Sequence, residues 1–228
     1  RRLNVDPLLS HGDLGELYGE FSNVTVYGTT AWTDNRAGSD GGAISCQTSN
    51  IVIDSINASF TNNSAVVGNG GAINAGDGAT LSIGGSVSFQ FNRAERNGGA
   101  ISVFDTKITV KGSTVTSNTA AAGAGGGIYC LTSIASFDES FFTANEAVWG
   151  GGLGLVSTGS VWSPIQPDSG AANATNCVFE RNTATDGGGI YSTGGYDIIR
   201  RCRFEENIAG GSGGAYLHSG VAVGIENC

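Results

Sequence analysis

Residues 89–101 read Phe-Gln-Phe-Asn-Arg-Ala-Glu-Arg-Asn-Gly-Gly-Ala-Ile. Two short signatures meet in this stretch. The first is an aromatic residue followed by Asn three positions later and Ala five positions later. The second is a Gly-Gly pair followed by a small residue and usually an aliphatic one. Both signatures return seven times, in the same order, along a chain of 228 residues. Two signatures that stay in phase predict a solenoid built from repeated structural units.

The first signature supplies two columns of residues, one copy per repeat. The aromatic column is Trp32, Phe60, Phe89, Val115, Phe142, Phe179 and Phe204, and the asparagine column is Asn35, Asn63, Asn92, Asn118, Asn145, Asn182 and Asn207. The steps between successive members of the aromatic column are 28, 29, 26, 27, 37 and 25 residues. The Gly-Gly signature follows each Asn, at residues 41–44, 70–73, 98–101, 125–128, 150–153, 187–190 and 213–216.

Short alternating segments of β-branched residues occupy the rest of each repeat. Ile51-Val52-Ile53 and Ile108-Thr109-Val110 are two of them, and a period of two with such residues favours strands. A repeat of this size cannot bury its apolar face alone, whereas stacked repeats can. We therefore predict an all-β fold, a parallel β-helix of about seven coils with three short strands per coil and a spacing of about 4.8 Å.

Each signature residue has an expected structural role in this fold. The aromatic column should point inward and stack from coil to coil. The asparagines should adopt the left-handed backbone conformation at a turn, and their amides should hydrogen-bond between coils as in other stacked-strand structures. The glycine pair should allow positive φ where the chain turns into the next strand.

The ends of the chain differ from the repeats. Residues 1–23 lie outside them and are expected to be an N-terminal cap or linker, with Leu8, Leu9, Leu14 and Leu17 covering the first coil, since an open solenoid end is a free strand edge. Residues 24–228 form the repeat domain. Its last segment, 225–228, begins a new coil, so we expect the β-helix to continue beyond it or a partner to cover it.

Composition excludes several classes of protein. Glycine makes up 38 of the 228 residues, without the period of three and the proline content of collagen. The net charge is −9, which argues against nucleic-acid binding. No apolar run is long enough for a membrane span. The low charge with an acidic excess is typical of an exposed outer surface.

The tandem Gly-Gly-Ala-aliphatic and Phe-x-x-Asn motifs resemble the repeats of the polymorphic outer-membrane proteins of chlamydiae. The resemblance covers residues 32 to about 216. It implies a right-handed parallel β-helix of the pectin-lyase-like type, displayed outside the cell, where such helices act as autotransporter adhesins. Trp32 and Val115 depart from the Phe position of this pattern, and Tyr216 departs from its aliphatic position.

Five cysteines leave at least one unpaired within this chain. Cys177 and Cys202 each lie two residues before a core aromatic, so they occupy one column in adjacent coils and could form a disulfide, and Cys228 extends that column. Cys46 and Cys130 share another column but lie three coils apart, too far to bond. The alternative interpretation is that the cysteines are small buried apolar residues.

Four sequons for N-glycosylation occur, at Asn23, Asn57, Asn62 and Asn173. They are glycan acceptors if the protein passes through a eukaryotic secretory pathway.

A catalytic or metal site has little support in the sequence. Acidic residues form no clear column, and the closest approach to a cluster is Asp105 beside Lys107 with Asp138 one coil on. His11 and His218 have no acidic partner in register. The group Arg200, Arg201 and Arg203 beside two glutamates is expected to be an ion-paired outer face. We predict no catalytic residues, no metal and no cofactor.

Two features are candidates for contact with a glycan or a partner. The fifth repeat carries an insert of about ten residues around Trp162, and inserts in solenoids become loops on one face. Tyr129 and Tyr191 each follow the aliphatic residue of a Gly-Gly signature, so they should point outward and could stack on sugar rings. Plain exposed strand tyrosines are the alternative.

These observations favour an extracellular, non-enzymatic structural or adhesive segment of a larger cell-surface or filament-forming protein. Its partners would be other copies or segments of an extracellular assembly, or molecules on a host or cell surface. A glycan-binding module and a carbohydrate-active enzyme of the same fold are the alternatives.

Overall fold

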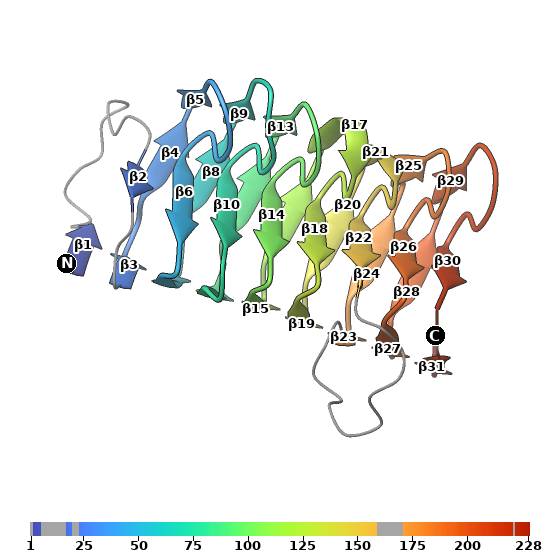
Figure 1. The fold of residues 1–228 in the computed structure, drawn as a ribbon. Helices are drawn as coiled ribbons and strands as arrows, with labels where there is room; N and C mark the ends of the chain where they lie inside the picture. The colour runs from blue at the N-terminus through green and yellow to red at the C-terminus, as the bar shows by residue number, and fades with distance from the viewer. Residues whose placement is uncertain (1, 6–16, 20–22, 159–170, 221) are drawn as a thin grey trace.

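A computed structural model describes residues 2–5, 17–19, 23–158, 171–220 and 222–228. These residues form a parallel β-solenoid of about seven coils, with no helix among them (Figure 1). The coils stack side by side from the N-terminal to the C-terminal end, so residues about 25 to 37 positions apart in the sequence lie next to each other in space.

Four parallel sheets run along the stack, named A to D here. Sheet A holds β1 (Arg2–Val5), β3 (Asn23–Tyr27), β7 (Asn50–Ser55), β11 (Thr80–Gly85), β15 (Lys107–Lys111), β19 (Ile134–Asp138), β23 (Ala171–Thr175), β27 (Tyr196–Arg200) and β31 (Ala222–Glu226). Sheet B holds β2 (Leu17–Gly19), β6 (Ile44–Gln47), β10 (Ile73–Gly76), β14 (Ile101–Phe104), β18 (Ile128–Leu131), β22 (Leu153–Val156), β26 (Ile190–Thr193) and β30 (Tyr216–Ser219).

The other two sheets contain shorter strands. Sheet C holds β4 (Ala31–Thr33), β8 (Ser59–Thr61), β12 (Ser88–Gln90), β16 (Thr114–Thr116), β20 (Phe141–Thr143), β24 (Val178–Glu180) and β28 (Arg203–Glu205). Sheet D holds β5 (Arg36–Ala37), β9 (Ser64–Ala65), β13 (Arg93–Ala94), β17 (Thr119–Ala124), β21 (Glu146–Trp149), β25 (Thr183–Ala184) and β29 (Ile208–Ala209). Each full coil therefore has four strands, one more than the three predicted, because the residues after each signature Asn pair briefly with the neighbouring coils.

The predicted aromatic stack is confirmed. Phe60 and Phe89 stack with ring centroids 4.8 Å apart, and Phe142, Phe179 and Phe204 continue the stack at 4.9 Å per step. These distances match the spacing between adjacent strands of a sheet. Val115 occupies the aromatic position of the fourth coil and divides the stack in two.

The asparagine ladder is also confirmed, but the predicted backbone conformation of these asparagines is wrong. The residue before each signature Asn adopts the left-handed conformation instead, with φ of 55° at Asn62 and Phe91 and 54° at Ser117. The signature Asn itself points into the core, where Asn92 and Asn118 are buried. Its amide then reaches the next coil, as in the hydrogen bond of 2.9 Å from Asn92 Nδ2 to Asn118 Oδ1.

The Gly-Gly pair is required by close backbone packing. Gly98 has a φ of 67°, and a Cβ there would lie 2.2 Å from the carbonyl oxygen of Ile101. Gly99 does not have positive φ, but its Cβ would lie 2.1 Å from the carbonyl oxygen of Gly126 in the next coil. The first glycine therefore makes the turn, and the second allows neighbouring coils to approach.

The described parts of the N-terminal segment continue the sheets. β1 pairs with β3, and β2 pairs with β6, both in parallel. Sheet pairing therefore crosses the expected boundary at residue 23. Leu8, Leu9 and Leu14 lie outside the described residues, and the division into an N-terminal cap and a repeat domain stays a prediction.

Candidate functional site

The outer face of sheet B carries a groove over four neighbouring strands, β6, β10, β14 and β18, which lie side by side in Figure 1. The groove has a volume of about 310 Å³, within the usual range for small-molecule sites. It is lined by Gln47, Asn69, Asn74, Ala75, Gly76, Asp77, Asn97, Ser102, Val103, Phe104, Tyr129 and Leu131.

The floor of the groove follows from strand alternation. Ile73 and Ala75 point into the core, so Asn74 points outward, and register places it between Ser45 and Ser102. Ser102 is followed by Tyr129 in the next coil. One column of outward positions therefore carries hydroxyl and amide groups in four successive coils, in which Asn74 is partly exposed while Ser45, Ser102 and Tyr129 are largely covered. Among the described residues, the side chains of Asn74, Ser102 and Tyr129 make no hydrogen bond to the protein.

A second outward column contains a gap at Gly76, which lies between Gln47 and Phe104. A Cβ at Gly76 would meet only Phe104, with its ring carbon Cδ1 at 3.9 Å. The ring of Phe104 is 47% exposed. The missing side chain at Gly76 therefore leaves a slot with an aromatic ring as its wall.

One side of the groove is a second ladder of side-chain hydrogen bonds. Asn69 Nδ2 donates to Asp40 Oδ1 at 3.0 Å, and Asn97 Nδ2 donates to Asn69 Oδ1 at 3.1 Å. The backbone N–H of Ala124 donates to Asn97 Oδ1 at 2.8 Å. These bonds hold the loops before the Gly-Gly pairs in one orientation. This ladder was not predicted from the sequence, although an Asp or Asn directly before Gly-Gly in the first three repeats signals it.

A second polar cluster lies inside the solenoid near its C-terminal end. Asp197 of β27 is 1% exposed, and its Oδ2 accepts a hydrogen bond of 2.8 Å from the hydroxyl of Tyr216 in β30. His218 Nδ1 lies 3.1 Å from the Tyr216 hydroxyl and 3.5 Å from Asp197 Oδ2. The expectation that His218 has no acidic partner is therefore wrong. Burial, together with the charge of Asp197, raises the pKa of Tyr216.

Register explains why this cluster forms. Asp197 occupies a core column that holds Ile51, Leu81 and Ile108 in earlier coils. Ser192 and His218 occupy the inward column of sheet B that includes Cys46. The sequence signal for this cluster is a polar residue, Asp197, in an otherwise apolar column. The signal can be seen only once the coils have been aligned.

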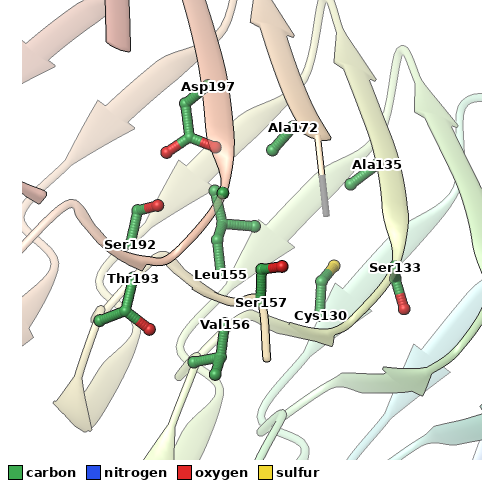
Figure 2. A pocket seen from close by; sticks show the side chains of 11 residues that line it. Cys130, Ser133, Ala135, Leu155, Val156, Ser157, Ala172, Ser192, Thr193 and Asp197 are labelled. Carbon is green, nitrogen blue, oxygen red and sulfur yellow. The ribbon is translucent and has the colours of Figure 1, made fainter. Parts of the chain in front are cut away.

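Asp197 and Ser192 line a cavity together with Cys130, Leu155 and other residues of three neighbouring coils (Figure 2). The cavity volume is about 10 Å³, which is room for about one water molecule. Ser192 Oγ and His218 Nε2 are buried without a hydrogen-bond partner in the described part of the chain. The cluster has acid–base groups, but this cavity cannot admit a sugar or a peptide.

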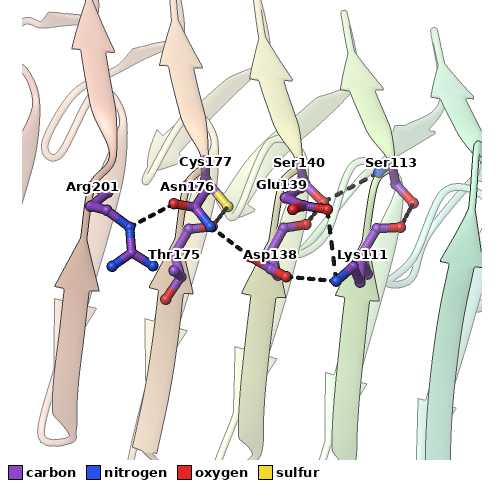
Figure 3. A network of polar contacts seen from close by, with 9 residues as sticks. All are labelled: Lys111, Ser113, Asp138, Glu139, Ser140, Thr175, Asn176, Cys177 and Arg201. Carbon is purple, nitrogen blue, oxygen red and sulfur yellow. Dashed lines mark hydrogen bonds and ion pairs between the residues drawn. The ribbon is translucent and has the colours of Figure 1, made fainter.

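The acidic and basic residues that the sequence brought forward lie on the outer surface instead. Lys111 Nζ contacts Asp138 Oδ2 at 3.0 Å, which lowers the pKa of Asp138 and raises that of Lys111. Asn176 bridges Asp138 to Arg201, with hydrogen bonds of 3.2 and 2.8 Å (Figure 3). Across the described residues, Asp105 and Lys107 form no ion pair with each other.

The arginine group is ion-paired in part, as expected. Arg203 pairs with Glu205 at 2.6 Å, and Arg200 pairs with Glu226 at 3.0 Å. Arg201 donates to Asn176 rather than to a carboxylate.

All five cysteines are free thiols in the structure, and the disulfide between Cys177 and Cys202 stays a prediction. The two residues do occupy one column in adjacent coils. Hydrogen bonding between the two thiols and burial raise the pKa of Cys177. Cys46 and Cys130 lie in the inward column of sheet B, three coils apart. Burial raises the pKa of Cys46 to about 11.

The tyrosines and sequons lie as follows. Tyr129 and Tyr191 both point outward, separated by Gly154, but Tyr129 is only 9% exposed, so its ring is largely covered. Trp162 lies outside the described residues. Asn57, Asn62 and Asn173 are exposed, and Asn23 is half-buried.

Neither metal binding nor membrane crossing by a helix is indicated. The described ranges contain no group of three or more His, Cys, Asp or Glu side chains arranged to hold a metal ion. They also contain no helix long and apolar enough to span a membrane.

One comparison with known proteins finds similarity in two segments of the chain. No curated protein and no solved structure matches the chain. The family model of the Chlamydia polymorphic membrane protein repeat matches residues 33–47 and 176–193. Both segments contain a signature Asn and a Gly-Gly pair, in the first and sixth coils. The chain is therefore a parallel β-solenoid in which two coils carry segments similar to the Chlamydia polymorphic membrane protein repeat.

Proposed function

We propose that this chain is a surface-displayed, non-enzymatic β-helix segment of a larger extracellular protein, with a structural and adhesive role. The observation that carries the proposal is the unbroken asparagine ladder, which runs through all seven coils from Asn35 to Asn207. A continuous ladder favours a stiff rod, whose outer faces can present binding surfaces away from a cell. The match to the polymorphic membrane protein repeat supports a location at the outer membrane or cell surface.

The adhesive role rests on how the residues divide between inside and outside. Every coil buries the same few positions, so the outward positions of the strands are free to vary without loss of the fold. On sheet B these outward positions form a groove. Partners on this proposal are molecules of another cell surface, or other copies of the same protein.

A carbohydrate-active enzyme of the same fold is the rival. Such an enzyme needs acid and base groups that touch substrate. The groups brought together at Asp197 and His218 line or adjoin a cavity of about 10 Å³, which favours the non-enzymatic proposal.

Intact cells of the source organism test the proposal. We expect antibodies against the protein to label these cells, external protease to remove the label, and beads coated with the full chain to attach to target cells or to one another. A protein protected from protease on intact cells would contradict surface display. If the cells are labelled but the coated beads do not attach, surface display stands and the adhesive role is contradicted. Turnover of a polysaccharide by the purified protein would contradict the non-enzymatic role.

A further inference from the structure

The groove on sheet B combines features that suit one class of ligand. We infer that it binds an uncharged oligosaccharide, with Phe104 as the platform for a sugar ring and Asn74 as its principal hydrogen-bonding partner. This inference deepens the proposed function, on which it rests, by naming the chemistry of the surface molecule that is recognised.

The polar groups of the groove match the hydroxyl groups of a sugar. Asn74, which is partly exposed, offers an amide with both donors and an acceptor, and the largely covered Ser102 and Tyr129 add hydroxyls at the floor of the groove. In the described part of the chain none of these three side chains is committed to a protein partner, while each is carried on a rigid strand. Asn69 and Asn97 are held in place by their ladder, and each amide nitrogen still has a second hydrogen to donate. Groups held in this way bind with little loss of conformational freedom.

The slot at Gly76 supplies the apolar contact. The exposed face of Phe104 borders a space that a side chain at Gly76 would fill. A pyranose ring has one face of C–H groups, which pack on an aromatic ring. The slot is one coil wide. The groove crosses three steps between neighbouring strands, each of about 4.8 Å, so the groove is about as long as three sugar rings in a row.

Charge decides between uncharged and acidic sugars. Asp77 is the one charged residue among those that line the groove, and no lysine or arginine lines it. An anionic glycan would approach a carboxylate with no cation to offset the repulsion, in a chain whose net charge is −9. The site therefore favours sugars without carboxylate or sulfate groups.

A peptide fits this groove less well than a sugar. Extended peptides gain affinity by pairing with the free edge of a sheet. β10 and β14 are both paired on each side within sheet B, so they have no backbone groups to offer. The groove presents side-chain amides and hydroxyls instead.

Binding of fluorescently labelled tetrasaccharides to the full chain tests the inference. The uncharged probes are maltotetraose, cellotetraose, laminaritetraose and chitotetraose, and tetragalacturonate is the acidic comparison. We expect at least one uncharged probe to bind and tetragalacturonate not to bind. Gly76→Val and Phe104→Ala should each weaken binding by about tenfold or more.

The chain offers a matched control for each variant. Phe141→Ala removes an aromatic ring of similar exposure, 49%, from sheet C, and should leave binding within about twofold. Gly76 does not have positive φ, and a Cβ there would make only ordinary van der Waals contacts, with Phe104 at 3.7 and 3.9 Å, so Gly76→Val should keep the circular dichroism spectrum and melting temperature. If that variant fails to fold, Asn74→Ala replaces it, with the same expected loss.

Several outcomes would overturn the inference. They are no binding of any uncharged probe, binding only of tetragalacturonate, or binding that survives both Gly76→Val and Phe104→Ala. Capture of an extended peptide from a random library, abolished by Gly76→Val, would assign the groove to peptides instead. If coated beads adhere although no sugar binds, the sugar-binding inference is contradicted and the proposed adhesive function still stands. If the protein binds sugar but is absent from the cell surface, the proposed surface function is contradicted and the sugar-binding inference still stands.

Discussion

Asn63 donates two hydrogen bonds to one oxygen atom of Asn92, the equivalent residue one coil on. Its backbone N–H lies 3.0 Å from Asn92 Oδ1, and its side-chain Nδ2 lies 2.9 Å from the same atom. Asn92 in turn donates to Asn118 Oδ1 and to the carbonyl oxygen of Phe60. Each buried amide is therefore bonded both to the next asparagine of the stack and to a backbone carbonyl of the preceding coil, and the loss of one member affects both adjacent coils.

Asn92→Ala should lower the free energy of unfolding by about 3 kcal/mol or more, because it removes the shared acceptor of two hydrogen bonds from Asn63 and the buried amide that donates to the carbonyl oxygen of Phe60. Asn173→Ala, at an exposed position of β23, should stay within about 0.5 kcal/mol of the parent chain. Urea unfolding followed by circular dichroism measures both. Equal effects of the two substitutions would contradict the ladder as a source of stability.

Gly99→Ala should be among the most damaging small substitutions in the chain. The added Cβ would lie 2.1 Å from the carbonyl oxygen of Gly126, so the two coils must separate, at a cost of about 3 kcal/mol or more. Gly38→Ala is the control, since a Cβ there meets nothing within 4 Å, and it should change stability by less than about 1 kcal/mol. Thermal unfolding compares them, and a tolerated Gly99→Ala would show that the coils are not packed this closely.

Tyr216 should make the protein sensitive to alkaline pH. Burial, with the charge of Asp197 beside the hydroxyl, raises its pKa above the usual value of about 10. The stabilising contribution is therefore complete below about pH 10 and is lost as pH rises above that value, because the unfolded tyrosine ionises first. Melting temperatures measured against pH should fall more steeply for the parent chain than for Tyr216→Phe. Tyr27→Phe, at an exposed position, should retain the steep fall, and parallel curves for all three proteins would refute the assignment.

The cysteine columns predict which thiols an oxidant can join. Cys177 and Cys202 are in register on adjacent coils, about 4.8 Å apart along the stack, which lies within the range of Cα separations that a disulfide spans. Treatment of a Cys228→Ser variant with diamide should link Cys177 to Cys202. Cys46 and Cys130 serve as the internal control, because three coils separate them. Peptide mass spectrometry before and after reduction shows whether either pair has formed a disulfide. A Cys46–Cys130 link would contradict the predicted order of the coils.

Some features of the groove on sheet B could not be predicted from the sequence. Tyr129 was expected to point outward, and it does, but the extent to which its ring is covered depends on neighbouring side chains and loops. Gly76 and Phe104 drew no attention because neither belongs to a repeated signature. Their meaning depends on the register between β10 and β14, which places the glycine beside the ring.

The sequence by itself determined the coil, its period, and the inward aromatic and asparagine columns. It could do so because every coil repeats the same local chemistry, and a residue that recurs in phase must meet its own equivalent in the next coil. The tertiary structure alone decided which residue of each turn is left-handed, that Asp197 meets Tyr216 and His218, and that Gly76 opens a slot beside Phe104. These features occur once or depend on exact stacking, so they arise from contacts between residues about 20 to 30 positions apart, which no periodic pattern records.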